Sequence, residues 1–174
     1  DNNRSRGLGD VYKRQANVVG KIISRNHKYR DEFIIIGAHF DHLGYGGPGS
    51  GSLKPDTNAV HNGANDNASG TAGLLELAHK LQANRKLLKR SILFIAFDAE
   101  EKGLLGSKYF VQNPTINIKN VSAMINMDMI GKMRDSTVII GGVGTSPVFE
   151  PILDSLSIDT CLLYTSDAAD DGHS

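Results

Sequence analysis

The feature that most constrains the fold is a series of apolar, β-branched runs separated by stretches with helical periodicity. Five runs have the length and composition of strands: residues 17–24, 33–38, 91–97, 121–127 and 137–140. Between them, residues 69–83 place leucine and alanine at helical spacing, and 104–111 and 148–156 predict two shorter helices. Strands that alternate with helices indicate an α/β fold with a mixed, mostly parallel sheet flanked by helices.

The apolar runs also predict positions in the sheet. Residues 33–38, 91–97 and 121–127 are almost continuously apolar, as expected for central strands covered on both faces. Runs 17–24 and 33–38 are joined by a polar turn too short for a crossover helix, so we expect this pair to be antiparallel. Asn67 or Ser69 can cap the start of the helix at 69–83.

Length and charge limit the functional classes. With 174 residues, 40% of them hydrophobic, the chain suits one globular domain. Nineteen basic and nineteen acidic residues cancel, so no basic patch points to nucleic acid or an anionic membrane surface, and we expect a small or neutral partner. No apolar run has the length of a transmembrane helix.

Both ends of the chain resemble translated sequencing adapters rather than protein sequence. These stretches are SRGLGDVYKRQ at 5–15 and CLLYTSDAADD at 161–171. Scars of this kind are excluded from fold reasoning, which leaves residues 16–160 as the native segment. The only cysteine, Cys161, lies in the second tail, so we expect neither disulfides nor thiolate metal ligands.

Residues that can bind a metal or move a proton follow three of the predicted strands and precede the long helix. They form four clusters: HFDH at 39–42, NDN at 65–67, DAEE at 98–101 and Asp128. Ligands in open α/β sheets bind beyond the carboxyl ends of the strands, so we expect these clusters to converge. Carboxylates so close together repel one another unless a divalent cation is bound, and imidazole with carboxylate suits zinc, with manganese or cobalt as substitutes.

The motifs around these clusters resemble those of the di-zinc aminopeptidases, zinc exopeptidases related to glutaminyl cyclases. Four motifs occur in order: GAHFDHLG, HNGANDNASGTAG, FDAEEKGLLGSKYF and INMDMIG, which together cover most of 34–131. The resemblance implies the three-layer α/β sandwich of zinc exopeptidases, incomplete at the C-terminal side. It divides the chain into an adapter-like tail at 1–15, a partial zinc peptidase domain at 16–160 and a second tail at 161–174.

The resemblance also implies roles for individual residues. A complete domain would bind two Zn²⁺ ions, and this chain would supply four of their ligands: His39, Asp66, Glu101 and Asp128. Asp66 would bridge the two ions, with a cis peptide between it and Asn67. His39 and Asp128 would bind the first ion, and Glu101 the second. The catalytic residues would be Glu100, the general base for a zinc-activated water, and Asp41, which orients His39.

One ligand of the family pattern is missing. The second zinc of that family also takes a histidine from a later segment, and no residue after Asp128 fits that place, because His173 belongs to the adapter-like tail. We therefore expect the second zinc to bind weakly and the fragment itself to be inactive. His42 and His61 are interpreted as loop or rim residues.

The predicted function is an aminopeptidase that hydrolyses N-terminal residues from peptides with a free N-terminus. A glutaminyl cyclase-like single-zinc acyltransferase and a non-catalytic domain of the same fold are the alternatives, and dipeptidase or carboxypeptidase variants stay open. The glycines at 141–144 lack the Lys-Ser/Thr ending of a phosphate loop, and Ser69 lacks the spacing of a serine hydrolase nucleophile. Many relatives are secreted or periplasmic, which favours the same location here.

Overall fold

The computed structural model describes residues 15–133, 135–156 and 161–164. The chain divides into two compact units, residues 1–131 and 132–174, and each is described by itself. Most of the two adapter-like tails lies outside the described residues, and their foreign origin stays a prediction. No helix in the described ranges is long and apolar enough to cross a membrane.

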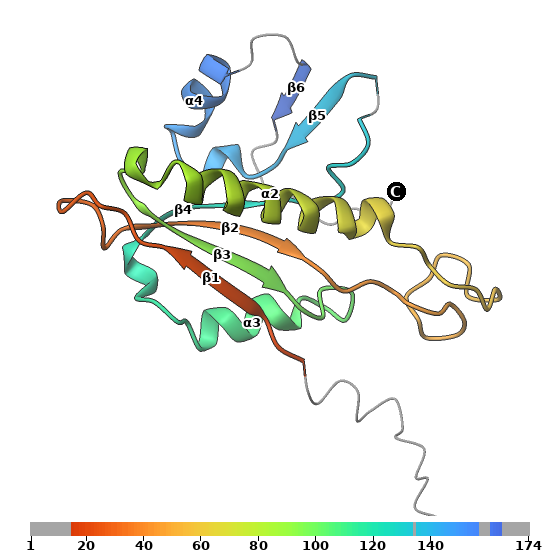
Figure 1. The fold of residues 1–174 in the computed structure, drawn as a ribbon. Coiled ribbons are helices and arrows are strands. Elements are labelled where there is room, and N and C mark those ends of the chain that lie inside the picture. The colour runs from red at the N-terminus through yellow and green to blue at the C-terminus, as the bar shows by residue number, and fades with distance from the viewer. Residues whose placement is uncertain (1–14, 134, 157–160, 165–174) are drawn as a thin grey trace, which may run out of the picture. The chain divides into compact units, whose positions relative to one another are not determined.

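The first unit is built on a four-stranded mixed sheet. Its strands are β1 (Val18–Ile22), β2 (Phe33–His39), β3 (Ser91–Phe97) and β4 (Val121–Asn126), in the order β1-β3-β2-β4. β2 is parallel to both β3 and β4, and β1 is antiparallel to β3 (Figure 1). The mixed, mostly parallel sheet predicted from the sequence is confirmed.

The position of β1 differs from the expectation. β1 runs opposite to β2, as predicted, but β3 lies between them, so the antiparallel partner of β1 is β3. Hydrogen bonds after β1 explain this placement. The Ser24 backbone N–H donates to Ser91 Oγ (3.0 Å) and the Ser24 hydroxyl donates to the Leu88 carbonyl (2.6 Å), which ties the end of β1 to the start of β3.

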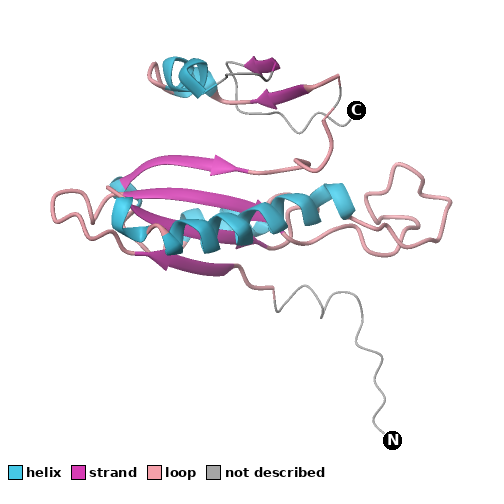
Figure 2. Ribbon diagram, turned by 45° about the horizontal axis from the view of Figure 1, so that its top comes forward, coloured by secondary structure: helices cyan, strands magenta, loops and turns pink. Residues whose placement is uncertain are grey.

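Alternation along the strands fills two hydrophobic layers. Helix α2 (Gly70–Ala83) packs on one face, where buried Leu74 meets Ile36 and Phe94. Helix α3 (Leu105–Gln112) packs on the other face through Phe110. The Phe110 ring packs edge to face with Phe97, and the other buried side chains of this face are Ile35, Leu93 and Ile95. Figure 2 shows α2 lying along the strands, and the three-layer sandwich is confirmed.

The expectation that β4 is covered on both faces is wrong in the described part of the chain. β4 pairs with β2 alone among the described strands, and the side chains of Met124 and Ile125 are 47% and 54% exposed. Neither side chain belongs to the two buried clusters around α2 and α3. The continuous apolar run therefore marks an edge strand of this unit rather than a buried one.

The second unit contains a short parallel pair. β5 (Thr137–Ile140) pairs with β6 (Cys161–Tyr164), and the unit also holds helix α4 (Phe149–Leu156) and a 3-10 turn at Val143–Thr145. The strand at 137–140 and the helix at 148–156 are confirmed. β6 was not predicted, because its residues were assigned to the adapter-like tail.

Candidate metal centre

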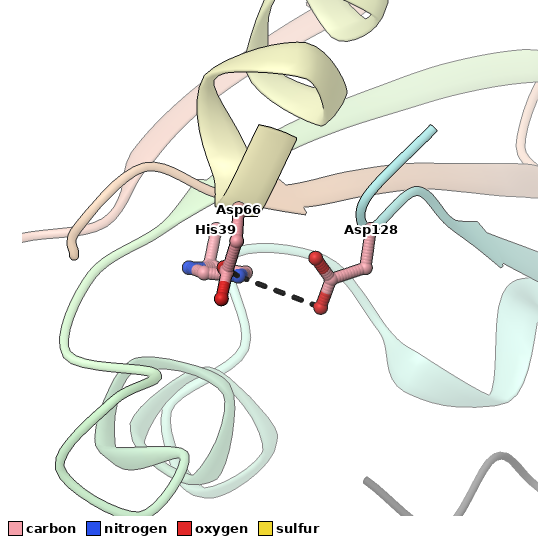
Figure 3. Close-up of side chains that lie close together, drawn as sticks. All are labelled: His39, Asp66 and Asp128. Atoms are coloured by element: carbon pink, nitrogen blue, oxygen red, sulfur yellow. Dashed lines mark ion pairs between the residues drawn. The ribbon is translucent and has the colours of Figure 1, made fainter. Parts of the chain in front are cut away.

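The predicted clusters converge at the carboxyl end of β2 and β4. His39 is the last residue of β2, Asp128 follows β4, and Asp66 precedes α2. His39 Nε2 lies 3.3 Å from Asp66 Oδ1 and 3.4 Å from Asp128 Oδ2 (Figure 3). For zinc bonds of about 2.0–2.1 Å, two ligand atoms at the corners of a tetrahedron lie about 3.4 Å apart. His39 therefore lies at the spacing of zinc ligands from both aspartates, and the ligand atoms of all three side chains, the tripod, lie within 4.8 Å of one another.

A buried amide holds the elements of this tripod together. Asn67 is 1% exposed, and its side-chain Nδ2 donates to the carbonyls of His39 (3.3 Å) and Met127 (3.0 Å). Its Oδ1 accepts the backbone N–H of Gly70 (3.0 Å), so Asn67 caps α2 as one of the two predicted candidates. The peptide between Asp66 and Asn67 is cis, as the resemblance implied.

Asp41 links His39 to the turn after β3. His39 Nδ1 lies 3.1 Å from the Asp41 carbonyl and 3.6 Å from Asp41 Oδ1, so the carbonyl is the nearer acceptor. The Asp41 carboxylate accepts the backbone N–H groups of Glu100 (2.9 Å) and Glu101 (3.2 Å). One short segment thus positions the imidazole and both glutamates.

Charge concentrates around the buried imidazole. Burial by itself would lower the pKa of His39, but hydrogen bonds with Asp128 and Asp41 and the charges of Asp128 and Glu100 raise that pKa to about 10. Burial would raise the pKa of Asp41, yet the contact with His39 and the two backbone N–H groups lower it below its usual value. Without a cation, the site therefore takes up a proton on His39.

A second cluster adjoins the first through Asp66. His42 Nδ1 lies 2.8 Å from Glu101 Oε1 and 4.0 Å from Asp66 Oδ1, the same oxygen that approaches His39. The His42 side chain is 20% exposed, and its ring forms a T-shaped pair with the His61 ring. His42, interpreted from the sequence as a loop or rim residue, thus lies in the loop after β2 and beside two predicted ligands, Asp66 and Glu101. Its position three residues after His39 was the only signal of this contact in the sequence.

The adjacent glutamates separate into different surroundings. Glu101 belongs to the cluster with His42, whereas Glu100 lines a cavity of about 250 Å³ beside His39. The remaining walls of this cavity come from the end of β3, the turn and helix α3 after it, and β4: Phe97, Asp98, Leu104, Ser107, Met124 and Asn126. Glu100 is thus placed next to the tripod and beside space that a small molecule can enter.

His173, the only histidine after Asp128, lies outside the described residues. Among the described residues, the other histidines near the tripod are His42, in the segment after β2, and His61, in the loop before Asp66.

Comparison with known proteins shows the family to which this arrangement belongs. The profile of peptidase family M28 matches residues 17–173. An aminopeptidase of Pseudomonas aeruginosa is 30% identical over 137 residues, which are 78% of this chain and 22% of that relative. The chain therefore spans less than a quarter of the length of this relative.

Solved structures agree on the fold. A zinc aminopeptidase from Bacillus subtilis is 28% identical with a TM-score of 0.59, over 86% of this chain and 34% of that one. The glutaminyl cyclase of Porphyromonas gingivalis has a TM-score of 0.62 over 87% of this chain and 56% of that one. At 21% identity, the likeness to the cyclase shows a shared fold and nothing further.

Proposed function

Because the chain belongs to peptidase family M28, we propose that it is the core of a zinc-dependent aminopeptidase that hydrolyses N-terminal residues from peptides. The observation that carries the proposal is the tripod of His39, Asp66 and Asp128, in which His39 Nε2 lies at the ligand spacing of tetrahedral zinc from an oxygen of each aspartate. The zinc aminopeptidase among the similar structures supports the same choice of metal.

The donor set fits two zinc ions in the complete domain. His39 and Asp128 would hold the first ion, Glu101 the second, and Asp66 would contribute to both, since its Oδ1 lies near both clusters. Zinc bound there supplies a Lewis acid that polarises the scissile carbonyl and lowers the pKa of water. The free amine of the peptide would bind to the carboxylates at this rim.

Glu100 would act as the general base and Asp41 as a positioning residue. Glu100 lines the cavity beside His39, so its carboxylate can take a proton from the attacking water and deliver it to the leaving amine. Asp41 holds the backbone N–H groups of both glutamates and lies beside His39 Nδ1. It therefore fixes the distance between the base and the first metal position.

The test is made on the full-length protein that contains this chain. We expect hydrolysis of aminoacyl-p-nitroanilides that is lost with EDTA and restored by zinc. Glu100→Gln should reduce kcat by about 10²–10⁴-fold while retaining zinc, because it removes proton transfer and no ligand. Glu76→Gln, on the exposed side of α2, is the matched control and should keep full activity. Full turnover by metal-free protein would overturn the proposal.

The cyclase alternative is tested in the same experiment. A peptide with N-terminal glutamine would lose ammonia without cleavage if the protein were a cyclase, and the protein would bind one zinc ion. Release of the N-terminal residue, with two zinc ions bound, supports the aminopeptidase. The 174-residue chain alone, which spans only part of such a protein, is expected to be inactive.

A further inference from the structure

The second cluster contains a histidine that the family pattern does not use. We propose that His42 is the third protein ligand of the second metal position, together with Asp66 and Glu101. The inference rests on the proposed function, because it concerns the second ion of the same centre. It replaces the expectation that this position retains only two carboxylates in this chain.

The distances within the cluster support His42 as a ligand of the second metal position. His42 Nδ1 is 2.8 Å from Glu101 Oε1 and 4.0 Å from Asp66 Oδ1. Ligand atoms of tetrahedral zinc lie about 3.4 Å apart, so shifts of about 0.6 Å at each pair would give metal geometry. Such shifts are within the reach of side-chain rotation of the two carboxylates.

The imidazole is held in place by its surroundings. A Cβ on Gly63 would lie 3.0 Å from the ring of His42, so the absence of a side chain at Gly63 makes room for that ring. Gly63 has φ of +64°, a conformation that favours glycine and brings the loop over the ring. The His61 ring, 6.0 Å away between centroids, contacts it edge-on. The nitrogen Nδ1 is therefore aimed at Glu101 before any metal arrives.

Glu101 is positioned from the opposite side. Its backbone N–H donates to Asp41 Oδ2 (3.2 Å), and its side chain is 16% exposed. A rival interpretation is that His42 only donates a hydrogen bond to Glu101 and orients it. A residue that only orients a ligand changes metal affinity by about 10–100-fold, whereas loss of a ligand should exceed that range.

The experiment observes the nitrogen–metal bond directly. The 174-residue chain, labelled with ¹⁵N-histidine, is titrated with ¹¹³Cd²⁺ as a spectroscopic substitute for zinc, and one-bond ¹¹³Cd–¹⁵N couplings are recorded. We expect two bound cadmium ions and couplings to two histidines, His39 and His42. His42→Gln keeps a hydrogen-bond donor toward Glu101 but removes the imidazole. It should lose one coupling and weaken the second ion more than 100-fold, with His39 unchanged.

His79→Ala is the matched control, since it removes an exposed imidazole on α2 that belongs to neither cluster, and it should keep both couplings. Coupling to His39 alone in the unmodified chain would refute the role of His42 and leave the first metal position intact. Normal affinity for two ions in His42→Gln would show that His42 only orients Glu101, which also overturns the proposal. If neither histidine couples to cadmium, the metal centre itself is refuted along with the inference.

Discussion

The substitution Asp41→Asn tests whether one carboxylate organises the centre. It keeps the size of the side chain and removes the charge that accepts two backbone N–H groups, from Glu100 and Glu101. Hydrogen bonds to a charged group contribute about 1.5–3 kcal/mol each, and a neutral one about 0.5–1.5 kcal/mol. Asparagine can keep one neutral bond, but its NH₂ group would face the other N–H. We therefore expect a loss of about 3 kcal/mol in the free energy of unfolding.

The measurement is urea unfolding of the metal-free chain followed by circular dichroism at pH 7. Asp56→Asn is the control, because Asp56 is an exposed loop residue, and it should change stability by less than about 0.5 kcal/mol. The pKa of Asp41 is lowered in the folded state, so its contribution is present above the unfolded value of about 3.9 and is lost as pH falls through the folded value.

The difference between the parent chain and Asp41→Asn should therefore be constant near neutral pH and narrow only in strong acid. An unfolding free energy of Asp41→Asn within about 0.5 kcal/mol of the parent would refute the organising role of the carboxylate.

Two further predictions concern metal binding. Because the pKa of His39 is raised to about 10 in the metal-free protein and zinc requires neutral imidazole, binding at pH 7 should release about one proton. Calorimetry in buffers of different ionisation enthalpy measures the number of protons released, which should fall toward zero as pH rises through 10. Zinc binding at pH 7 without proton release would contradict the raised pKa of His39. Gly70→Ala should abolish the site, since its Cβ would overlap Asn67 Oδ1 and the Met127 carbonyl, whereas Gly20→Ala meets no atom within 4 Å. Equal zinc content in these two variants would show that the packing at Gly70 is not needed.

The sequence predicts the central strands better than their neighbours. Apart from His39 and Ser91 at their ends, β2 and β3 contain no polar side chain, because helices cover both faces, and that property is local. Strand order depends on contacts between distant residues, such as the hydrogen bond from the Ser24 N–H to Ser91 Oγ. The hydrophobic periodicity of a segment does not predict such contacts. The exposure of β4 likewise depends on which strand lies beside it and not on its own composition.

The same distinction applies to the metal centre. His39, Asp66 and Asp128 were predictable because each adjoins the end of a strand or the start of a helix, and the topology then brings them together. The contact between His42 and Glu101 depends on the conformation of the glycine-rich loop, including the positive φ of Gly63. Loop conformation of this kind is set by tertiary contacts, so the sequence pattern placed His42 only at the rim.

The buried amide of Asn67 would couple metal binding to the stability of three segments of the chain. Its hydrogen bonds join the His39 carbonyl at the end of β2, the Met127 carbonyl after β4 and the first turn of α2, one residue from Asp66. An ion bound by Asp66 would therefore resist the separation of all three segments, and unfolding of any one of them would weaken its binding. Zinc at 100 times its dissociation constant would add about 2.7 kcal/mol to the stability of the unit, so zinc supply would set how long the folded chain survives proteolysis.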